Sequence, residues 1–437
     1  MSTTAPSRAA GAAHRLAALA EDMLGGPLPV RLRAWDGSET GPADAPVVVM
    51  RSRRALRRLL WQPGELGLAQ AYVTGELDIE GDLGQGLRAV WAAQREGGLR
   101  PPTLGPADTA RALATAARLG VLGPRPAAPA SQARLRGGLH SRSRDRAAIS
   151  HHYDLSNDFY GLLLDETMAY SCGYWTRDDE GFGPADAQRA KLELICRKLA
   201  LKRGARLLDI GCGWGSLTLH AAERHGVQVT AVTLAREQAA YVRERVRERG
   251  LAERVEVVCQ DYRDIEGGGF DAVSTIEMGE HVGDAEYPGF AAALHRLVRP
   301  CGRVLVQQMS RGPGAPGGGP FIEAYIAPDM HMRPLGHTVA LLEGAGLEVR
   351  HTESLREHYV RTVGAWHHTL EERWEAFVRL VGEETARVWR LYLVGGALAF
   401  EEGRMGVDQI LGVRPGPGGD SGMPMATRQW YEGLERP

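Results

Sequence analysis

The chain has 437 residues, of which 43% are hydrophobic and 24% charged, an ordinary globular composition with room for two domains. Its formal net charge of −2 excludes a global attraction to nucleic acid, and no stretch approaches the ~20 apolar residues of a membrane-spanning helix. The five cysteines are widely spaced with no C-x-x-C pair, which predicts reduced thiols, no disulfide framework and no metal site. We therefore expect a cytoplasmic protein that at most rests on the inner face of a membrane.

Residues 12–100 predict a small α/β domain. Apolar residues recur at helical spacing over Ala12–Leu24 and alternate as in a strand over Val30–Trp35. After the turn signal Asp36-Gly37, a partner strand is expected over Val47–Met50. Two further segments, Leu66–Leu77 and Leu83–Trp91, complete the domain.

An arginine-rich helix follows the second strand, with Arg51, Arg53, Arg54, Arg57 and Arg58 beside apolar Leu56, Leu59 and Leu60. A basic amphipathic helix can bind an anionic membrane surface, but a solvated helix face has the same pattern. Both interpretations also apply to residues 101–146, a linker rich in Pro, Ala and Arg with a helix over Ala107–Leu119.

Residues 147–437 follow a βαβ rhythm, which predicts an α/β fold with a doubly wound, mostly parallel sheet. The expected strands are Arg206–Ile210, Gln228–Thr233, Val255–Cys259, Asp271–Ile276 and Gly302–Met309, with helices over Arg236–Gly250 and Ala285–Val298. The glycine-rich stretch Gly312–Gly319 suggests a lid or an insertion edge, and Leu370–Phe400 is expected to be helical with an aromatic core face.

The strand Arg206–Ile210 runs directly into the turn Gly211-Cys212-Gly213-Trp214-Gly215 and then into a helical pattern. Such a turn brings backbone N–H groups and a helix N-terminus close to a ligand, which predicts a nucleotide-type site. Nicotinamide, flavin and S-adenosylmethionine (SAM) enzymes share G-x-G-x-G turns. The form found here, preceded by Asp209, resembles motif I of the SAM-dependent methyltransferases.

Six ordered motifs together resemble the cyclopropane-fatty-acyl-phospholipid synthase family, which includes the mycolic-acid-modifying methyltransferases. The motifs are His151-His152-Tyr153-Asp154 with Asn157-Asp158-Phe159-Tyr160, Met168–Trp175, the glycine turn, Val232-Thr233-Leu234 with Glu237-Gln238, Gln260–Asp264, and Glu280-His281-Val282-Gly283. The resemblance is close from Ser150 to about Gln409 and looser over the N-terminal domain.

The resemblance implies that SAM is the co-substrate. The residues matching the family's SAM site are Tyr170, Ser171, Asp209, Gly211, Gly213, Gly215, Thr233, Gln238, Gln260, Asp261 and Tyr262. A Gln amide such as Gln238 can bond a ribose hydroxyl, and Asp261, after the third strand, can accept the adenine amino group.

The reaction implied is methyl transfer from SAM to the cis double bond of an unsaturated phospholipid acyl chain, followed by proton loss to a bound bicarbonate. The matching bicarbonate cradle is Cys172 through its backbone, Glu280, Gln307, Met309 and Tyr359. The family has histidine and isoleucine where this chain has Gln307 and Met309. Because glutamine cannot exchange a proton near neutral pH, bicarbonate is held differently or the proton is taken from a different place.

The altered base site favours a methylene-branched (10-methylene type) product, which a separate reductase would convert to a methyl branch. Plain cyclopropane synthesis is the alternative within the family. A catalytically impaired SAM- or lipid-binding protein is the alternative of another class, whereas small-molecule or RNA methylation and nucleic-acid binding are disfavoured. The sequence leaves open whether the chain forms a homo-oligomer.

Two residues invite other interpretations. His281 could be a second base or a structural residue that caps or packs a helix. Cys172 could be a nucleophile, but SAM chemistry needs none and no activating base is apparent beside it.

Overall fold

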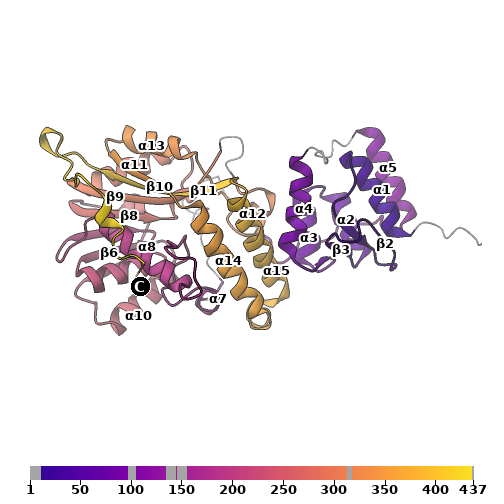
Figure 1. The fold of residues 1–437 in the computed structure, drawn as a ribbon, viewed down its shortest axis with the longest axis horizontal. Coiled ribbons are helices and arrows are strands. Elements are labelled where there is room, and N and C mark those ends of the chain that lie inside the picture. The colour runs from indigo at the N-terminus through magenta and orange to yellow at the C-terminus, as the bar shows by residue number, and fades with distance from the viewer. Residues whose placement is uncertain (1–10, 97–104, 134–143, 145–154, 313–316, 436–437) are drawn as a thin grey trace, which may run out of the picture. The chain divides into compact units, whose positions relative to one another are not determined.

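The computed structural model describes residues 11–96, 105–133, 144, 155–312 and 317–435, and the chain forms two compact units (Figure 1). Unit 1 comprises Met1–Gln132 with Val381–Leu398, and unit 2 comprises Ala133–Leu380 with Ala399–Pro437. This division differs from the expected one in two ways. The linker as far as Gln132 belongs to unit 1, and so does a stretch near the C-terminus.

Unit 1 is built on a four-stranded sheet of order β2-β1-β3-β4. As predicted, the first strand pairs with Val47–Met50, and the two run parallel. A short strand that was not predicted, β2, forms a hairpin with β1. The elements are α1 Ala12–Leu24, β1 Arg31–Arg33, β2 Glu39–Thr40, β3 Val47–Met50, α2 Arg53–Trp61, α3 Glu65–Val73, β4 Leu77–Glu80, α4 Leu83–Arg95 and α5 Pro106–Arg118.

The predicted linker is part of the core of unit 1. Helix α5 packs against α1, and the two are also joined by an ion pair between Arg111 and Asp22. Ala116, Leu119 and Val121 are buried, with exposed fractions of 1%, 8% and 0%. The apolar residues of this stretch therefore contribute burial to unit 1, which is why the segment does not behave as a separate linker.

The arginines of α2 make contacts within unit 1. Arg58 is buried and its Nε donates to Glu76 at 2.8 Å, while Arg54 pairs with the same carboxylate at 3.2 Å. Arg57 donates from Nε to the carbonyl of Val121 at 2.8 Å. These side chains tie α2 to the start of β4 and to the segment after α5. These three arginines therefore differ from both interpretations of the sequence, a membrane-binding face and a fully solvated helix face.

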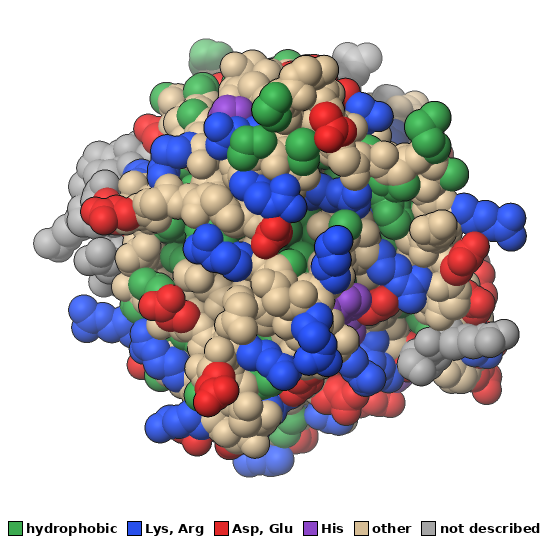
Figure 2. Space-filling model, turned by 90° about the vertical axis from the view of Figure 1, so that its left-hand side faces the viewer, with side chains coloured by type: hydrophobic (Ala, Val, Ile, Leu, Met, Phe, Trp, Pro, Cys, Tyr) green, Lys and Arg blue, Asp and Glu red, His purple; other side chains and the backbone are tan. Residues whose placement is uncertain are grey.

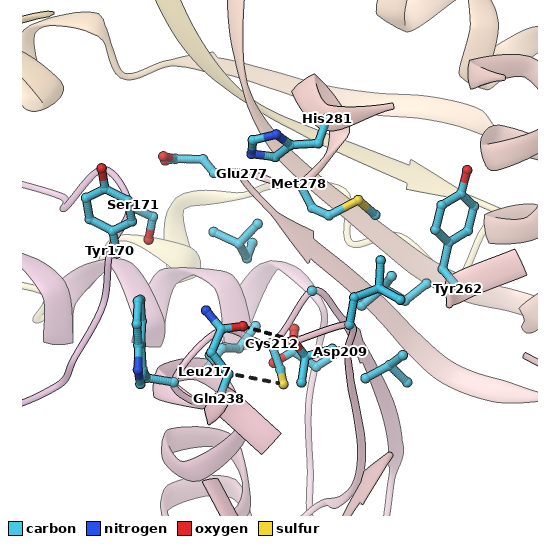
Figure 3. A pocket seen from close by; sticks show the side chains of 18 of the residues that line it. Tyr170, Ser171, Asp209, Cys212, Leu217, Gln238, Tyr262, Glu277, Met278 and His281 are labelled. Carbon is cyan, nitrogen blue, oxygen red and sulfur yellow. Dashed lines mark hydrogen bonds between the residues drawn. The ribbon is translucent and has the colours of Figure 1, made fainter. Parts of the chain in front are cut away.

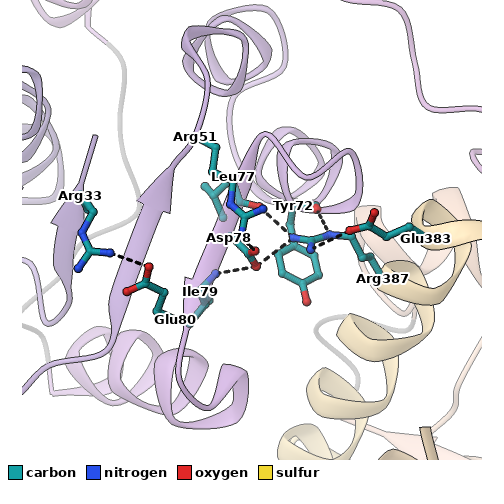
Figure 4. A network of polar contacts seen from close by, with 9 residues as sticks. All are labelled: Arg33, Arg51, Tyr72, Leu77, Asp78, Ile79, Glu80, Glu383 and Arg387. Carbon is teal, nitrogen blue, oxygen red and sulfur yellow. Dashed lines mark hydrogen bonds and ion pairs between the residues drawn. The ribbon is translucent and has the colours of Figure 1, made fainter. Parts of the chain in front are cut away.

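The C-terminal stretch of unit 1 comes from helix α15, Trp374–Glu401, whose backbone leaves helical geometry at Gly382 (φ 80°, ψ 155°), next to the unit boundary. Beyond this break Arg387 reaches into unit 1 (Figure 4). It donates to the carbonyls of Tyr72 and Leu77 at 2.7 and 3.1 Å and to the carboxylate of Asp78 at 3.0 Å. Its guanidinium also lies 4.3 Å from the centroid of the Tyr72 ring. A buried cation with this many partners fixes residues 381–398 in unit 1.

Unit 2 contains a seven-stranded sheet of order β10-β11-β9-β8-β5-β6-β7. The strands are β5 Arg206–Ile210, β6 Gln228–Thr233, β7 Val255–Cys259, β8 Phe270–Ile276, β9 Val298–Arg311, β10 Glu348–Ser354 and β11 Met405–Val413. The five strands from β9 to β7 are parallel, and β11 is antiparallel to both of its neighbours. The predicted α/β class with a mostly parallel, doubly wound sheet is confirmed, and the predicted strands match within a few residues.

Helices cover both faces of this sheet (Figure 1). One apolar core lies under α11 and α13, and the other under α8, α9 and α10. The helices of unit 2 are α7 Asn157–Leu163, α8 Pro184–Lys198, α9 Ser216–His220, the π-helical η1 Ala221–His225, α10 Arg236–Glu248, α11 Tyr287–Leu297, α12 Pro320–Tyr325, α13 Leu335–Gly344 and α14 Arg356–Glu372. Short 3₁₀ turns are η2 Tyr262–Asp264, η3 Gly279–His281, η4 Pro417–Gly419 and η5 Arg428–Trp430.

Charges of both signs are mixed on the face that Figure 2 shows. On the face in Figure 2, Lys and Arg side chains are interspersed with Asp and Glu, and hydrophobic side chains are scattered among them. Ion pairs such as Arg245–Glu248 at 2.7 Å on α10 are of this kind. No helix in the described ranges is long and apolar enough to cross a membrane. The motif His151-His152-Tyr153-Asp154 and residues 313–316 of the loop Gly312–Gly319 lie outside the described residues.

Candidate cofactor and active site

The glycine turn after β5 forms one wall of a cavity in unit 2 (Figure 3). Gly211, Gly213 and Gly215 have φ of 77°, 54° and 82°, a region that only glycine adopts readily. A Cβ on Gly211 would lie 2.9 Å from the side chain of Met278, and one on Gly215 would lie 2.9 Å from Val242. Gly211 and Gly213 line the cavity, whereas Gly215 lies beneath the turn and allows α9 to begin there.

Asp209 holds this turn in place. It lines the cavity, but its two oxygens accept hydrogen bonds from Thr218 at 2.8 Å and Ser274 at 2.9 Å. Burial raises the pKa of this carboxyl group, and the two hydroxyl donors oppose that shift. Asp209 therefore joins β5 to α9 and β8, and it supports the cofactor site from behind.

Tyr170 and Ser171 line the opposite side of the cavity and are positioned by α8. The Nζ of Lys191 donates to the Ser171 hydroxyl at 2.7 Å, and Gln188 donates to the Ser171 carbonyl at 2.7 Å. Lys191 also lines the cavity and is 1% exposed, and its burial lowers its pKa. The sequence analysis did not identify this lysine as a site residue. Lys191 occupies a position on the buried face of α8.

Thr233 and Gln238 meet at the end of β6. The Thr233 hydroxyl donates to the Oε1 of Gln238 at 2.9 Å, which turns the nitrogen end of the amide toward the cavity (Figure 3). Both residues are buried and line the cavity. This arrangement leaves an amide donor where a hydroxyl-bearing ligand could accept from it.

The three residues after β7 differ in whether they line the cavity. Gln260 and Tyr262 line the cavity, and the Tyr262 ring packs edge-on against Phe290 with centroids 5.1 Å apart. Asp261 is not among the lining residues, and its two oxygens accept from the backbone N–H, Nε and Nη2 of Arg263 at 2.6–2.9 Å. These bonds show that Asp261 shapes the η2 turn, and its expected bond to adenine stays a prediction.

Three of the five predicted cradle residues converge on a residue that was not predicted, Glu277. The backbone N–H of Cys172 and the Nε2 of Gln307 each donate to its Oε1 at 2.8 Å. The hydroxyl of Tyr359 donates to its Oε2 at 2.5 Å. A carboxylate of the chain therefore lies where these three donors would hold a bicarbonate ion.

A chain of hydrogen bonds orients Gln307. Lys198 donates to Gln409 at 2.8 Å, and Gln409 donates to the Oε1 of Gln307 at 2.9 Å, so that the Nε2 of Gln307 faces Glu277. All three side chains are buried. Hydrogen bonds aligned in this way polarise one another and fix the orientation of each amide. A glutamine at this position is therefore suited to donating to a carboxylate.

The backbone at the end of β8 turns sharply to place Glu277 in the site. Glu277 has φ 50°, in the left-handed region, and its N–H donates to the carbonyl of Gln307 at 2.6 Å. Met168, with φ 55°, also lines the cavity. Non-glycine residues in this conformation are strained by roughly 1–3 kcal/mol, and such strain is concentrated at functional sites.

Glu280 and Met309 stand apart from these three donors. Glu280 is 1% exposed, and no side chain among the described residues donates to its carboxyl oxygens. Burial and the nearby charge of Glu277 raise the pKa of Glu280 to about 8, although the backbone amides of Glu280 and Met309 act in the opposite direction. Burial also raises the pKa of Glu277, and the bonds from Tyr359, Cys172 and Gln307 oppose the rise. With two carboxyl groups in one buried site, Glu277 is the one stabilised as an anion and Glu280 the one that keeps a proton.

Two further side chains were left open by the sequence. His281 lines the cavity from η3, and burial lowers its pKa to about 4, so it is neutral at physiological pH. Burial raises the pKa of the Cys172 thiol well above its ordinary value. A thiol in this state is a poor nucleophile, and Cys172 contributes its backbone N–H instead.

A family model described as mycolic acid cyclopropane synthetase matches residues 140–410 of the chain. The chain belongs to this family. It is 37% identical over 421 residues to a probable fatty acid methyltransferase of Mycobacterium tuberculosis, covering 92% of this chain and 95% of the relative. It is 34% identical over 404 residues to a tuberculostearic acid methyltransferase of the same organism, covering 89% of each chain.

The solved structure of mycolic acid cyclopropane synthase CmaA1, complexed with SAH and CTAB, is 30% identical, with a TM-score of 0.58. It matches 61% of this chain and 97% of its own. The predicted family, fold class and use of SAM are confirmed, and the protein is a SAM-dependent methyltransferase of the cyclopropane synthetase family. The open glycine turn and the cavity-facing amide of Gln238 fit a ligand with a ribose and a charged tail.

Within this family site, Glu277 is the candidate functional residue that the sequence analysis missed. The signal was present, because Glu277 directly follows Ile276, the last residue of β8. An acidic residue at the carboxyl end of a central parallel strand lies where α/β proteins bind their ligands. Its three donors come from positions 172, 307 and 359, and only the fold brings them together.

Proposed function

We propose that the protein transfers the SAM methyl group to the cis double bond of an unsaturated phospholipid acyl chain and yields a methylene-branched chain of the 10-methylene type. The observation that carries this proposal is the Glu277 carboxylate, held by Cys172, Gln307 and Tyr359. It supplies a base built into the chain, in the position that the family resemblance gives to bicarbonate.

The first requirement is to align a weak nucleophile with a strong electrophile. SAM, when bound, supplies a methyl group on a positively charged sulfur. The cavity walls around the glycine turn, Tyr170 and Gln238 would hold it, and the buried site excludes water that would compete with the alkene. The π pair of the alkene forms the new C–C bond, the C–S bond breaks with its electrons on sulfur, and a cation remains on the neighbouring carbon. Aromatic faces such as Tyr170 stabilise this cation.

The second requirement is to remove one proton. A hydride shift moves the cation to the methyl-bearing carbon, and a methyl proton then passes to Glu277 while its C–H pair forms the exocyclic double bond. A buried carboxylate with a raised pKa is a better proton acceptor than a solvated one. Glu280, whose pKa is raised to about 8 by burial and by the charge of Glu277, stays protonated and keeps a second negative charge away.

Two products remain chemically close. If the proton leaves before the hydride shift, the ring closes to a cyclopropane, which is the second candidate because CmaA1 is named a cyclopropane synthase. Two observations favour the methylene product. The proposed base, Glu277, is fixed by three hydrogen bonds, whereas a bicarbonate ion could diffuse away. In addition, a relative of 34% identity is named a tuberculostearic acid methyltransferase. A separate reductase would then convert the methylene to a methyl branch.

A phospholipid substrate requires contact with a membrane, and we propose that the protein binds the inner face of the membrane. Unit 1 offers Trp61 and Leu122, which are 52% and 51% exposed. The indole Nε1 of Trp61 donates to the carbonyl of Gly123, the residue that follows Leu122, at 3.1 Å. A half-exposed Trp beside an aliphatic residue suits the membrane–water interface.

The test is expression in a host that is rich in oleoyl phospholipid and makes no cyclopropane lipid, followed by mass spectrometry and proton NMR of the fatty acid esters. A gain of one CH₂ with exocyclic methylene protons supports the proposal. Cyclopropane protons support the second candidate, and no mass gain contradicts both.

Binding to oleoyl phospholipid vesicles should weaken in the double variant Trp61→Ser/Leu122→Ser but not in Leu113→Ser, an equally exposed position on α5.

A further inference from the structure

A cluster of metal-ligating side chains lies in unit 2 on α8 and at the end of α9 and η1. One ring nitrogen of His220, one of His225 and the Sγ of Cys196 all lie within 4.8 Å of one another. Glu193 joins them, because its Oε2 lies 3.3 Å from the Nε2 of His220 and 3.0 Å from the Nε2 of His225. None of the four lines the SAM cavity or takes part in the proposed reaction.

A local distortion of the helix brings the two histidines together. Five residues of an α-helix advance by about 500°, which would place His220 and His225 about 140° apart around the axis. Residues Ala221–His225 instead form a π-helical turn, in which hydrogen bonds connect residues five apart. The two rings therefore face the same side, with centroids 6.1 Å apart. Such π-helical turns are rare and occur frequently at functional sites.

The other two members lie on one face of α8. Glu193 and Cys196 are three residues apart, so their side chains project from the same side of the helix. Cys196 is 0% exposed, and the side chains of His220, His225 and Glu193 are 14%, 18% and 27% exposed. The cluster is thus shielded at the thiol and reachable from solvent at the histidines and the glutamate.

We propose that Glu193, Cys196, His220 and His225 bind a divalent transition metal ion of the Zn²⁺ type. In tetrahedral sites with bonds of 2.0–2.1 Å to N and O, the ligand atoms lie about 3.3 Å apart. The separations of Glu193 Oε2 from the two Nε2 atoms already match this. With a Zn–S bond of 2.3 Å the sulfur must lie about 3.6 Å from each nitrogen, and the ligand atoms of Cys196, His220 and His225 already lie within 4.8 Å of one another.

Metal binding releases a proton and changes the role of Glu193. The thiol proton of Cys196 passes to solvent, and each imidazole binds the ion through Nε2 as the neutral tautomer that carries its proton on Nδ1, so the ion replaces the contacts between the two rings and Glu193. Arg197, whose Nε donates to the Oε1 of Glu193 at 2.7 Å, keeps that carboxylate oriented. A bound ion would clamp α8 to the helix that begins at the glycine turn, and so would act as a structural site.

The experiment uses the purified full chain after treatment with a chelator, titrated with Co²⁺ as a spectroscopic probe for Zn²⁺. We expect saturation at one ion per chain, the visible bands of tetrahedral Co²⁺ and a thiolate-to-metal charge-transfer band, all displaced by Zn²⁺. Cys196→Ser should lose the charge-transfer band, and Glu193→Gln should weaken binding by roughly 10- to 100-fold. Cys259→Ser, at an exposed thiol outside the cluster, should retain every signal.

A charge-transfer band that persists in Cys196→Ser, or Co²⁺ uptake without tetrahedral bands, would overturn the proposal and leave a histidine–glutamate hydrogen-bond cluster. Because Cys196 is buried and its serine variant could misfold, His225→Gln provides an independent check. Zn²⁺ should raise the melting temperature of the unmodified chain and raise that of His225→Gln less. Equal rises in the two proteins would contradict the site.

Discussion

The hydroxyl of Tyr359 donates a 2.5 Å hydrogen bond to the carboxylate of Glu277, which lies 82 residues earlier in the chain. The Tyr359 ring packs on Phe400 with centroids 4.6 Å apart, so the hydroxyl is held independently of the bond that it makes. This pairing fixes one oxygen of the proposed base, and Tyr359 itself is not among the residues that line the candidate SAM cavity.

Tyr359→Phe should lower kcat by roughly 10- to 100-fold, as expected for one hydrogen bond to a charged group, and should leave SAM affinity unchanged. Loss of the donor raises the pKa of Glu277, so the acidic limb of the pH–rate profile should move to higher pH. Steady-state kinetics across pH checks both effects. An unchanged profile with lower kcat would assign Tyr359 a purely structural role.

Glu277→Gly should remove the base and leave its three donors in place, and glycine suits the backbone φ of 50°. In bicarbonate-free buffer we expect turnover to fall by about 10²- to 10⁴-fold, the usual contribution of a general base. Added bicarbonate should restore part of the activity of the variant and none in the unmodified enzyme. If the unmodified enzyme itself needs bicarbonate, Glu277 does not replace that ion.

Glu280→Gln should change how stability depends on pH. The unfolded chain loses the Glu280 proton near pH 4.5, whereas the folded chain keeps it up to about pH 8. Within this window the folded state binds more protons, so this group makes the free energy of unfolding fall as pH rises. Urea denaturation at about pH 5 and about pH 8 should therefore reveal a smaller fall in the Gln variant. An equal fall in both proteins would mean that Glu280 titrates at an ordinary pKa.

Gly215→Ala should destabilise the glycine turn. A φ of 82° costs an L residue about 1–2 kcal/mol, and the clash with Val242 adds about 1–3 kcal/mol. Gly204→Ala is the matched control, since its φ is 81° and a Cβ there meets no heavy atom within 4 Å. The difference between the two unfolding free energies measures the packing cost alone, and only Gly215→Ala should also weaken SAM binding.

Arg387→Met should lower the free energy of unfolding of unit 1 by about 3 kcal/mol, because it leaves Asp78 and two backbone carbonyls short of a buried donor. Glu383→Gln is the control on the same helix, because Glu383 is 65% exposed and lies 3.8 Å from Arg387. It should change stability by less than about 0.5 kcal/mol. Similar losses in the two variants would show that the charge of Arg387, rather than its buried hydrogen bonds, matters.

The sequence predicted the five parallel strands of unit 2 because they are short apolar runs bounded by turns, and the run Arg206–Ile210 has the same bounds in the structure. It did not predict β10 and β11, which complete the sheet. It also located most of the cavity wall, since Gly211, Gly213, Thr233 and Gln238 lie in local motifs at strand ends. Such short motifs can be recognised from the sequence alone because they depend on neighbouring residues.

Two features escaped because they depend on contacts distant in sequence. The role proposed for Glu277 follows from donors on three separate segments of the chain. The proposed metal cluster escaped because the five-residue spacing of His220 and His225 suits no regular α-helical site, and only the π-helical turn makes it favourable.

Residues 381–398 have a consequence for the modularity of the protein. The chain passes between the two units three times, after Gln132, Leu380 and Leu398, so no single cut separates them. A chain shortened to begin at Ala133 would still carry Trp389 and Leu393, side chains that are buried in the intact protein. Unit 2 could be produced alone only if residues 381–398 were replaced by a short polar connection. For the same reason, a gene fusion made at a single point in the chain cannot transfer one complete unit without part of the other.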